Sequence, residues 1–204
     1  MCCNKITEFN IPASVTSMGS NPFRGCRGLQ TITVDNDNTR YSIFCNALVE
    51  TENMRLIVYP YGLVTDTFTI PDGIKIIGSI SFGYEGPRFS KLIIPDSVTT
   101  IESSAFPFSR VQEIVIGSGV QEMGYGVFTY CDSLQTVTIA EGATVIGNGA
   151  FRHCDNLAAI TIPDSVTQIA EDAFEYDYEI NIIGSANSEA IQYAKRKGYN
   201  YTIK

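Results

Sequence analysis

One segment recurs along this chain of 204 residues at a nearly constant spacing, and this repeat constrains the fold more than any other feature. Two of its copies are Ile94–Ile101 (IPDSVTTI) and Ile162–Ile169 (IPDSVTQI). With the proline position taken as zero, the steps between zero positions are 23, 25, 11, 24, 22, 23 and 23 residues. One period near 23 therefore runs through the chain, with a single irregular stretch at about 35–70. The zero positions are Pro12, Asp35, Pro60, Pro71, Pro95, Gly117, Ala140 and Pro163.

The apolar residues keep the same place in each repeat. Positions −3 and −1 are apolar, as at Leu92 and Ile94, which is the alternation of a strand with one buried face. Proline at zero ends that strand because it cannot donate a ladder hydrogen bond. Apolar residues return at +3 and +6, and a phenylalanine stands at +11. One repeat cannot bury these groups alone, whereas stacked repeats can, so the pattern predicts a solenoid. The phenylalanines are Phe23, Phe82, Phe106, Phe128, Phe151 and Phe174.

This pattern resembles the BspA-like class of leucine-rich repeat. The residues that carry the resemblance are the Leu-x-x-Ile-x-Ile-Pro-x-x-Val-x-x-Ile core and an Ala-Phe pair followed by Cys, as at Ala150, Phe151 and Cys154. It covers Ile6 to about Tyr178, although Ser109 and Asp177 stand where the family favours Cys. The resemblance implies a leucine-rich repeat solenoid, mostly β, with parallel strands stacked along its axis and short turns. We expect one repeat domain over 1–204, with about eight repeats in 6–178 and a C-terminal cap in 179–204.

The cap is expected to contain one helix. Ser188 can cap its N-terminus, Glu189 suits the positive end of the helix dipole, and Gly198 can adopt the left-handed conformation that ends a helix. Such a helix would cover the open edge of the last turn, which otherwise invites aggregation. The basic residues at 195–197 suit the C-terminal end of the helix, and a docking patch is the alternative role for them.

Charge and composition exclude some functions. The net charge is −8, from 14 basic and 22 acidic residues, which argues against nucleic acid as a partner. No apolar run approaches the ~18 residues of a membrane span, so we expect no membrane insertion by this segment. No signal peptide is visible at the start of the chain. With one histidine and no group of reactive residues outside the repeat pattern, the sequence predicts neither an enzyme nor a cofactor.

Two sets of residues are candidates for binding. The first is a column of rings at position +13, namely Tyr84, Phe108, Tyr130, His153 and Tyr176. The aromatic neighbours of His153 indicate a stacked ring, not a base or a metal ligand, and an exposed stripe of this kind could hold a protein or a glycan. The second set lies on the outer face of the strands, where Thr and Gln dominate. It contains Gln112, Gln135, Thr136 and Thr138, and the alternative is that threonine simply suits strands.

The cysteines and the acidic loop do not predict a metal site. Cys26, Cys131 and Cys154 share position +14, which indicates small buried thiols, and we expect them to be free. The loop that begins at Asp35 lacks the glycine and glutamate of a calcium loop, which leaves a turn as its expected role.

The predicted function is non-enzymatic binding of macromolecules, because a solenoid offers a long regular surface in place of a deep apolar pocket. The resemblance implies more. It implies a cell-surface or secreted location and a protein partner, such as a host extracellular or surface protein, with a role in adhesion. Two alternatives remain open, namely a structural spacer that presents other domains and a glycan-binding solenoid.

Overall fold

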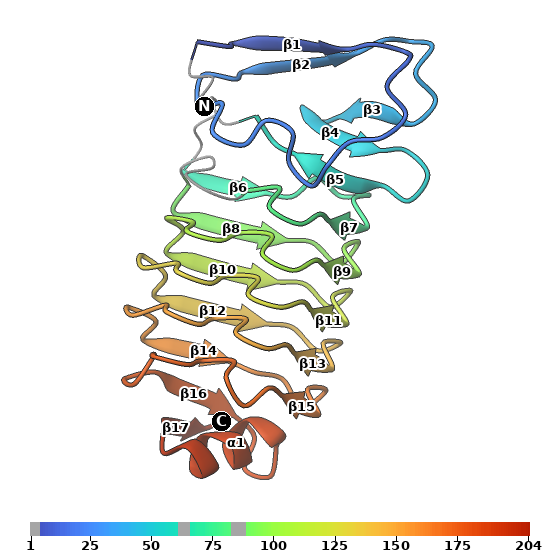
Figure 1. Ribbon diagram of the computed structural model, residues 1–204. Coiled ribbons are helices and arrows are strands. Elements are labelled where there is room, and N and C mark those ends of the chain that lie inside the picture. Colours follow the sequence, from blue (N-terminus) through green and yellow to red (C-terminus); the bar gives the residue numbers. More distant parts are fainter. Residues whose placement is uncertain (1–4, 61–65, 83–88) are drawn as a thin grey trace.

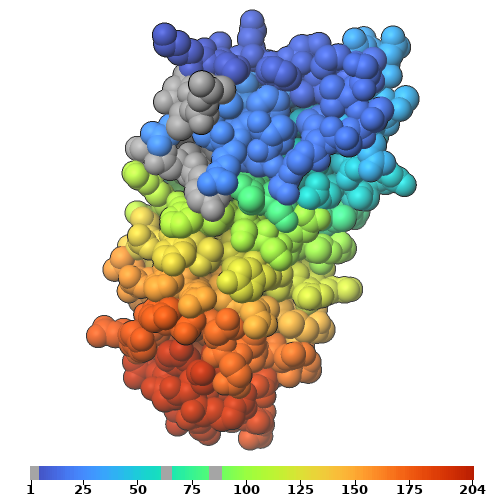
Figure 2. Space-filling model, in the orientation of Figure 1, coloured from blue at the N-terminus to red at the C-terminus, as the bar shows by residue number. Residues whose placement is uncertain are grey.

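The computed structural model, which describes residues 5–60, 66–82 and 89–204, is an elongated solenoid (Figure 1). The space-filling view shows the chain advancing along the long axis, from the N-terminal residues at one end to the C-terminal residues at the other (Figure 2). The predicted fold is therefore confirmed. Tyr84, one of the candidate binding residues, lies outside the described residues.

A seven-stranded parallel sheet forms one side of the solenoid. Leu92 pairs with Ile114, and Ile114 pairs with Val137, so position −3 of each repeat meets position −3 of the next. All three side chains are buried, whereas Thr136 and Thr138 on the opposite face are exposed. The period-2 pattern predicted this arrangement. In spatial order the strands are β6 (Thr67–Thr69), β8 (Lys91–Ile94), β10 (Glu113–Ile116), β12 (Thr136–Ile139), β14 (Ala159–Thr161), β16 (Asn181–Gly184) and β17 (Asn200–Ile203).

A second sheet is built from the two-residue strands that follow each turn. Met123 pairs with Ile101 and Ile146, and all three side chains are buried at position +6. These short strands are β7 (Ile76–Ile77), β9 (Thr100–Ile101), β11 (Glu122–Met123), β13 (Val145–Ile146) and β15 (Gln168–Ile169).

Five of the six phenylalanines at +11, from Phe82 to Phe174, form one stack of rings in the main core, whereas Phe23 packs in a separate N-terminal cluster. Neighbouring centroids from Phe82 to Phe174 are 4.7, 5.2, 5.4 and 5.4 Å apart. The planes of neighbouring rings differ by at most 17°, and every ring in this stack is at most 1% exposed. Each ring therefore covers the faces of its neighbours, which is how stacking supplies the burial that one repeat lacks.

The irregular stretch forms an antiparallel unit at the end of the second sheet. It contains β3 (Tyr41–Phe44), β4 (Ala47–Glu50) and β5 (Arg55–Val58). Arg55 and Leu56 pair in parallel with Ile76 and Ile77, which are at positions +5 and +6. The assignment of Pro60 to a zero position is therefore wrong, because the strand before it belongs to the second sheet and not to the first.

The antiparallel unit divides the interior in two. All four residues of β4 are buried, because Leu48 faces an N-terminal core while Ala47 and Val49 face the main core. The N-terminal core lies under a separate two-stranded parallel sheet. Its strands are β1 (Glu8–Ile11) and β2 (Thr31–Val34), and both have the phase that the repeat predicted.

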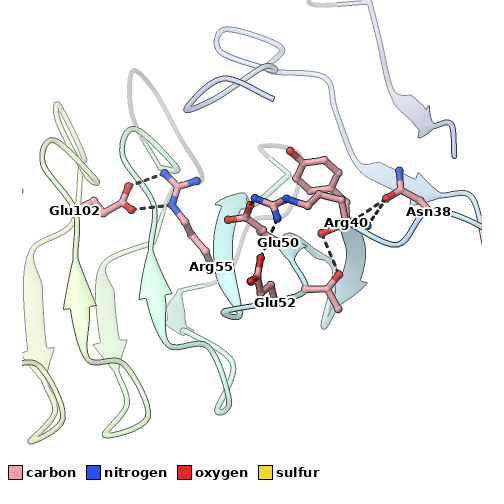
Figure 3. Close-up of polar contacts among 8 residues, drawn as sticks. Asn38, Arg40, Glu50, Glu52, Arg55 and Glu102 are labelled. Atoms are coloured by element: carbon pink, nitrogen blue, oxygen red, sulfur yellow. Dashed lines mark hydrogen bonds and ion pairs between the residues drawn. The ribbon is translucent and has the colours of Figure 1, made fainter. Parts of the chain in front are cut away.

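One ion pair joins this unit to the regular repeats, and others lie within the unit (Figure 3). The guanidinium of Arg55 donates two hydrogen bonds to the carboxylate of Glu102, at 2.8 and 2.6 Å. The same carboxylate accepts the backbone N–H of Ser79 at 2.9 Å. Within the irregular stretch itself, Arg40 pairs with Glu50. The clasp Arg55–Glu102 thus links β5 to the residue after β9 across 47 residues of sequence.

The C-terminal end carries the predicted helix α1 (Glu189–Lys197). The Ser188 hydroxyl accepts the Ile191 N–H at 3.4 Å, and Gly198 ends the helix with φ of 76°. The helix packs against β15, β16 and β17. Two strands within the expected cap were not predicted. Both β16 and β17 extend the first sheet in register, so the helix covers the end of the second sheet and β17 forms the end of the first.

Candidate functional site

The rings at position +13 form a second stack, on the outside of the solenoid. We call Phe108, Tyr130, His153 and Tyr176 the aromatic ladder. Its successive ring centroids are 4.8, 4.5 and 4.2 Å apart, and the ring planes differ by 1°, 11° and 5°. The structure therefore brings all the described residues of the predicted column into contact, and His153 is a stacked ring within it, as predicted.

The backbone holds these rings in an unusual conformation. The four residues of the ladder have φ values of 58°, 57°, 56° and 77°, in the left-handed region that aromatic residues rarely occupy. The backbone N–H of Tyr130 donates to the carbonyl of Arg152 at 2.9 Å, and that of His153 donates to Glu175 at 3.1 Å. A forward hydrogen bond to the next turn thus fixes Phe108, Tyr130 and His153, and holds their rings in line.

The two inner residues of the ladder, Tyr130 and His153, present ring edges and not ring faces to solvent. Phe108 and Tyr130 are each 42% exposed and Tyr176 is 40% exposed. Both faces of Tyr130 and of His153 are covered by the rings of adjacent turns. The exposed surface is therefore a row of ring edges, with the Tyr130 and Tyr176 hydroxyls at their tips.

Arg152 lies beside the ladder, at position +12, and the sequence reasoning missed it. Its guanidinium carbon is 5.4 Å from the centroid of the Tyr176 ring and its Nη2 pairs with Glu175 at 2.8 Å. A hydrogen bond with Tyr176 is the main cause that raises the pKa of Arg152, and Tyr125 contributes to the same shift. The only sequence signal was that +12 is polar in successive repeats, as at Thr129, Arg152 and Glu175.

The sheet face carries the second candidate set where it was predicted. Gln112, Gln135, Thr136 and Thr138 are all exposed, on or next to the adjacent strands β10 and β12. The charged residues of this face are already paired, because Lys91 donates to Glu113 at 2.7 Å. The corner that runs from Cys131 to Leu134 lies between Tyr130 and Gln135 along the chain, and its Cys131 and Leu134 side chains are buried.

The described residues show no arrangement suited to catalysis by the groups that the sequence singled out. The Cys154 thiol is buried and donates to the Phe128 carbonyl at 3.1 Å, and burial raises its pKa well above the ordinary value, which opposes a nucleophilic role. The cysteines at 26, 45, 131 and 154 are all free thiols. A shallow depression of about 540 Å³ on the second sheet is lined by polar residues such as Thr99, Gln121 and Thr144.

The described part of the chain offers neither a cluster of metal ligands nor a membrane-spanning helix. Within residues 5–60, 66–82 and 89–204, no group of three or more His, Cys, Asp or Glu side chains is arranged to hold a metal ion. In the same part of the chain, no helix has the length and apolar character needed to cross a bilayer.

Comparison with known proteins gives matches to one family and to its solved structures. A family model described as "BspA type Leucine rich repeat region (6 copies)" matches residues 1–60 and 61–181. A leucine-rich cell surface protein of Faecalibacterium prausnitzii is 36% identical over 90% of this chain, with a TM-score of 0.77. No curated protein sequence matches.

Two more distant structures share the fold. A leucine-rich repeat protein of Eubacterium ventriosum is 22% identical over 87% of this chain, with a TM-score of 0.75, and the pneumococcal vaccine antigen PcpA is 20% identical over 98%, with a TM-score of 0.69. The matches cover 49%, 48% and 56% of the three solved chains, so this chain spans about half their length.

Proposed function

The chain belongs to the BspA-type leucine-rich repeat family, and from that premise we propose that it is a non-enzymatic module that binds a protein at the cell surface through its aromatic ladder. The partner that we propose is an extracellular or surface protein of a host, and the role is adhesion. The Faecalibacterium prausnitzii relative, which is described as a cell surface protein, supports the location.

The observation that carries this proposal is the placement of exposed rings on left-handed backbone. For a residue other than glycine this conformation costs about 1–2 kcal/mol. Stacking returns about 0.5–1.5 kcal/mol for each ring pair, and rings that stay about 40% exposed gain only part of the benefit of burial. Tyr130 stacks on two rings, so stacking returns about as much as its backbone conformation costs, and the ring adds little net stability at a position where glycine would suit the backbone. A strained backbone conformation that is offset only by half-exposed rings supports a role in function.

The composition of the surface supports a protein partner. Tyrosine and arginine are enriched among the residues that dominate binding energy in protein interfaces. Tyr125 is 56% exposed, and it lies with Arg152 on the same side of the repeat as the ladder. The rings are held rigid before any partner arrives, which lowers the entropic cost of association.

The geometry favours a protein over a glycan. A sugar ring binds an aromatic side chain by lying flat against its face, and both faces of Tyr130 and of His153 are occupied by neighbouring rings. The exposed edges and hydroxyls suit the carbonyl groups and the ring faces of a protein partner instead, because aromatic pairs favour edge-to-face contacts.

The test is a binding assay with purified extracellular-matrix proteins and three forms of the chain. The double variant Tyr130→Gly/Tyr176→Gly keeps the left-handed backbone and removes two rings. We expect it to weaken the binding of any partner at least about 30-fold, the effect of one interface hot spot. The control Gln135→Ala/Thr138→Ala, on the sheet face, should stay within about threefold of the native chain.

Three outcomes would contradict the proposal. The first is unchanged binding by the ladder variant, and the second is loss of binding by the sheet-face control alone. The third is binding of the native chain to a glycan array, if the ladder variant no longer binds that array. The sheet-face outcome would move the binding site to Gln112, Gln135, Thr136 and Thr138, and the glycan outcome would change the class of partner.

A further inference from the structure

A column of buried hydrogen-bond donors runs along the interior at position +14. The Cys131 thiol donates to the carbonyl of Phe106 at 3.3 Å, and the Cys154 thiol donates to that of Phe128 at 3.1 Å. In each case the acceptor is the phenylalanine at +11 of the preceding turn. Ser109, an earlier residue of the column, is buried and carries a neutral hydroxyl, whose oxygen accepts the Val111 N–H at 3.4 Å. A neutral donor at this position therefore satisfies a buried carbonyl of the neighbouring turn.

Asp177 occupies the same position in the last complete repeat. Asp177 is only 3% exposed. Its Oδ1 accepts the backbone N–H of Cys154 at 2.8 Å, whereas its Oδ2 is buried without a hydrogen-bond partner. An ionised carboxylate can only accept hydrogen bonds, and a buried oxygen with a full or partial negative charge and no donor is costly. A protonated acid would instead have one donor to offer, as a thiol has.

The repeat identifies the acceptor for that donor. Cys154 and Phe128 are separated by 26 residues, and a step of 23 residues from each gives Asp177 and Phe151. Beyond the last repeat the series continues, since the Tyr199 hydroxyl donates to the carbonyl of Phe174 at 3.0 Å. The carbonyls of Phe106, Phe128 and Phe174 thus each accept a side-chain donor, and Asp177 holds the position that serves Phe151.

The charges around Asp177 also favour its neutral form. The groups that act on it are Asp155 and the Cys154 thiol of the preceding turn and the Tyr199 phenol that follows α1. None of these three becomes a cation, and Asp155 opposes a second negative charge nearby. Burial, the largest cause, raises the pKa of Asp177 to about 8 even though the N–H of Cys154 lowers it.

We propose that Asp177 is a neutral carboxylic acid in the folded protein, and that its proton takes the place of the missing thiol hydrogen by donating from Oδ2 to the carbonyl of Phe151. This proton holds the last complete repeat to the one before it. Deprotonation places a charge inside the column, and loosens the attachment of the C-terminal repeat, β16 and α1. The C-terminal end is then a pH-sensitive latch that releases as the solution becomes alkaline.

The sign of the pH effect follows from proton binding. The folded state keeps the Asp177 proton from its unfolded pKa near 4 up to about 8, so over this range the folded state binds more protons than the unfolded state. Stability from this group is therefore fully present below about pH 4 and is lost as the pH rises. The unfolding equilibrium constant should increase by up to about tenfold for each pH unit in that window.

The first experiment compares urea unfolding of the native chain and of Asp177→Asn at about pH 5 and about pH 8. Asparagine can accept from Cys154 and donate to Phe151 at any pH, so it removes the titration but keeps both hydrogen bonds. From pH 5 to pH 8, we expect the unfolding constant of the native chain to rise by about 100- to 1000-fold relative to that of the variant. The control is Asp132→Asn, which changes an exposed acid. Its unfolding constant should stay within about twofold of that of the native chain at both pH values.

The second experiment needs no variant, and so decides the matter if Asp177→Asn fails to fold. The carboxyl carbon of Asp177 is followed by NMR through a pH titration of the native chain. Titration above about pH 6.5, together with loss of amide protection in β16 but not in β10, supports the proposal. Titration below about pH 5, or an unfolding ratio that does not change between pH 5 and pH 8, overturns it. Both readouts are independent of whether the aromatic ladder binds a protein.

Discussion

At the scale of single residues, the interior stack gives each phenylalanine two neighbours of its own kind. Phe151 is fully buried, with Phe128 and Phe174 each 5.4 Å away between ring centroids. Phe151→Ala should therefore lower the free energy of unfolding by about 3–5 kcal/mol, since it opens a cavity and removes two stacked contacts. Urea unfolding monitored by circular dichroism measures this value.

The control for that prediction is Gln135→Ala on the sheet face, because Gln135 is exposed. Its effect on the free energy of unfolding should stay within about 0.5 kcal/mol. Equal effects of the two substitutions would mean that Phe151 does not belong to the core.

The outer stack predicts a different order of stability. Tyr130→Ala removes two ring contacts and leaves alanine on left-handed backbone with φ of 57°. Tyr130→Gly removes the same contacts and relieves the strain of about 1–2 kcal/mol, offset in part by the greater freedom of glycine in the unfolded chain. The glycine variant should therefore be the more stable of the two, by up to about 1 kcal/mol. Thermal or urea unfolding that ranked alanine above glycine would show that the ladder backbone is not strained.

At the scale of the elements, the Arg55–Glu102 clasp is expected to tie β5 to the residue after β9, across the intervening strand β7 (Figure 3). Glu102→Ala leaves the half-buried Arg55 without its main partner and should cost about 1.5–3 kcal/mol. Glu113→Ala breaks the more exposed pair with Lys91 and should cost at most about 1 kcal/mol. Urea unfolding of both variants gives the comparison. Equal losses in the free energy of unfolding would show that the clasp is no stronger than the exposed pair.

The clasp also has a defined response to acid. The hydrogen bond from Arg55 is the main cause that lowers the pKa of Glu102, against the opposing effect of burial. A lowered pKa gives stability that is fully present above the unfolded value near 4.3 and is lost as the pH falls through the folded value. The difference between native and Glu102→Ala stabilities should therefore shrink below about pH 4.

The elements that the sequence predicted are those in which burial follows the repeat. Strands β8 to β14 and the limits of α1 follow from apolar spacing, from Ser188 and from Gly198. Strand β17 was missed because all four of its residues are exposed, so that no buried face marks it. Strand β5 was placed in the wrong sheet because Pro60 mimics the repeat proline, and only long-range pairing with Ile76 and Ile77 corrects it.

The aromatic ladder could be predicted for the same reason, since an equal position in each repeat places Tyr130, His153 and Tyr176 in one row. Its left-handed backbone could not, because aromatic residues carry no preference for that conformation. Asp177 was noted as a departure from the cysteine pattern, but its missing partner depends on atoms of another turn.

At the scale of the whole molecule, each turn depends on the next one for burial, so the last turn depends on the cap. A chain that ends after Gly184 loses α1 and β17. It also loses the packing of Tyr193, a residue of α1 that is fully buried against Phe174. This shortened chain should unfold at lower urea concentration and associate with increasing protein concentration, because loss of α1 uncovers β15, the last strand of the second sheet, and the apolar side chains beneath the helix. Light scattering measures the association.

The matched control keeps the whole cap and weakens only the start of its helix. Ser188→Ala in the full chain should cost about 1 kcal/mol and cause no association, since the edge stays covered. A shortened chain that stayed monomeric with an unchanged unfolding midpoint would show that the last turn does not need its cap.

Strand β4 contributes side chains to both cores, with Leu48 on one side and Ala47 and Val49 on the other. A shift of one residue along this strand would exchange the two sets and disturb both interiors at once. During evolution, whole repeats can therefore be gained or lost on either side of β4 more easily than the length of β4 itself can change. Variation in the length of such arrays is expected to leave this segment intact and to be concentrated among the regular repeats.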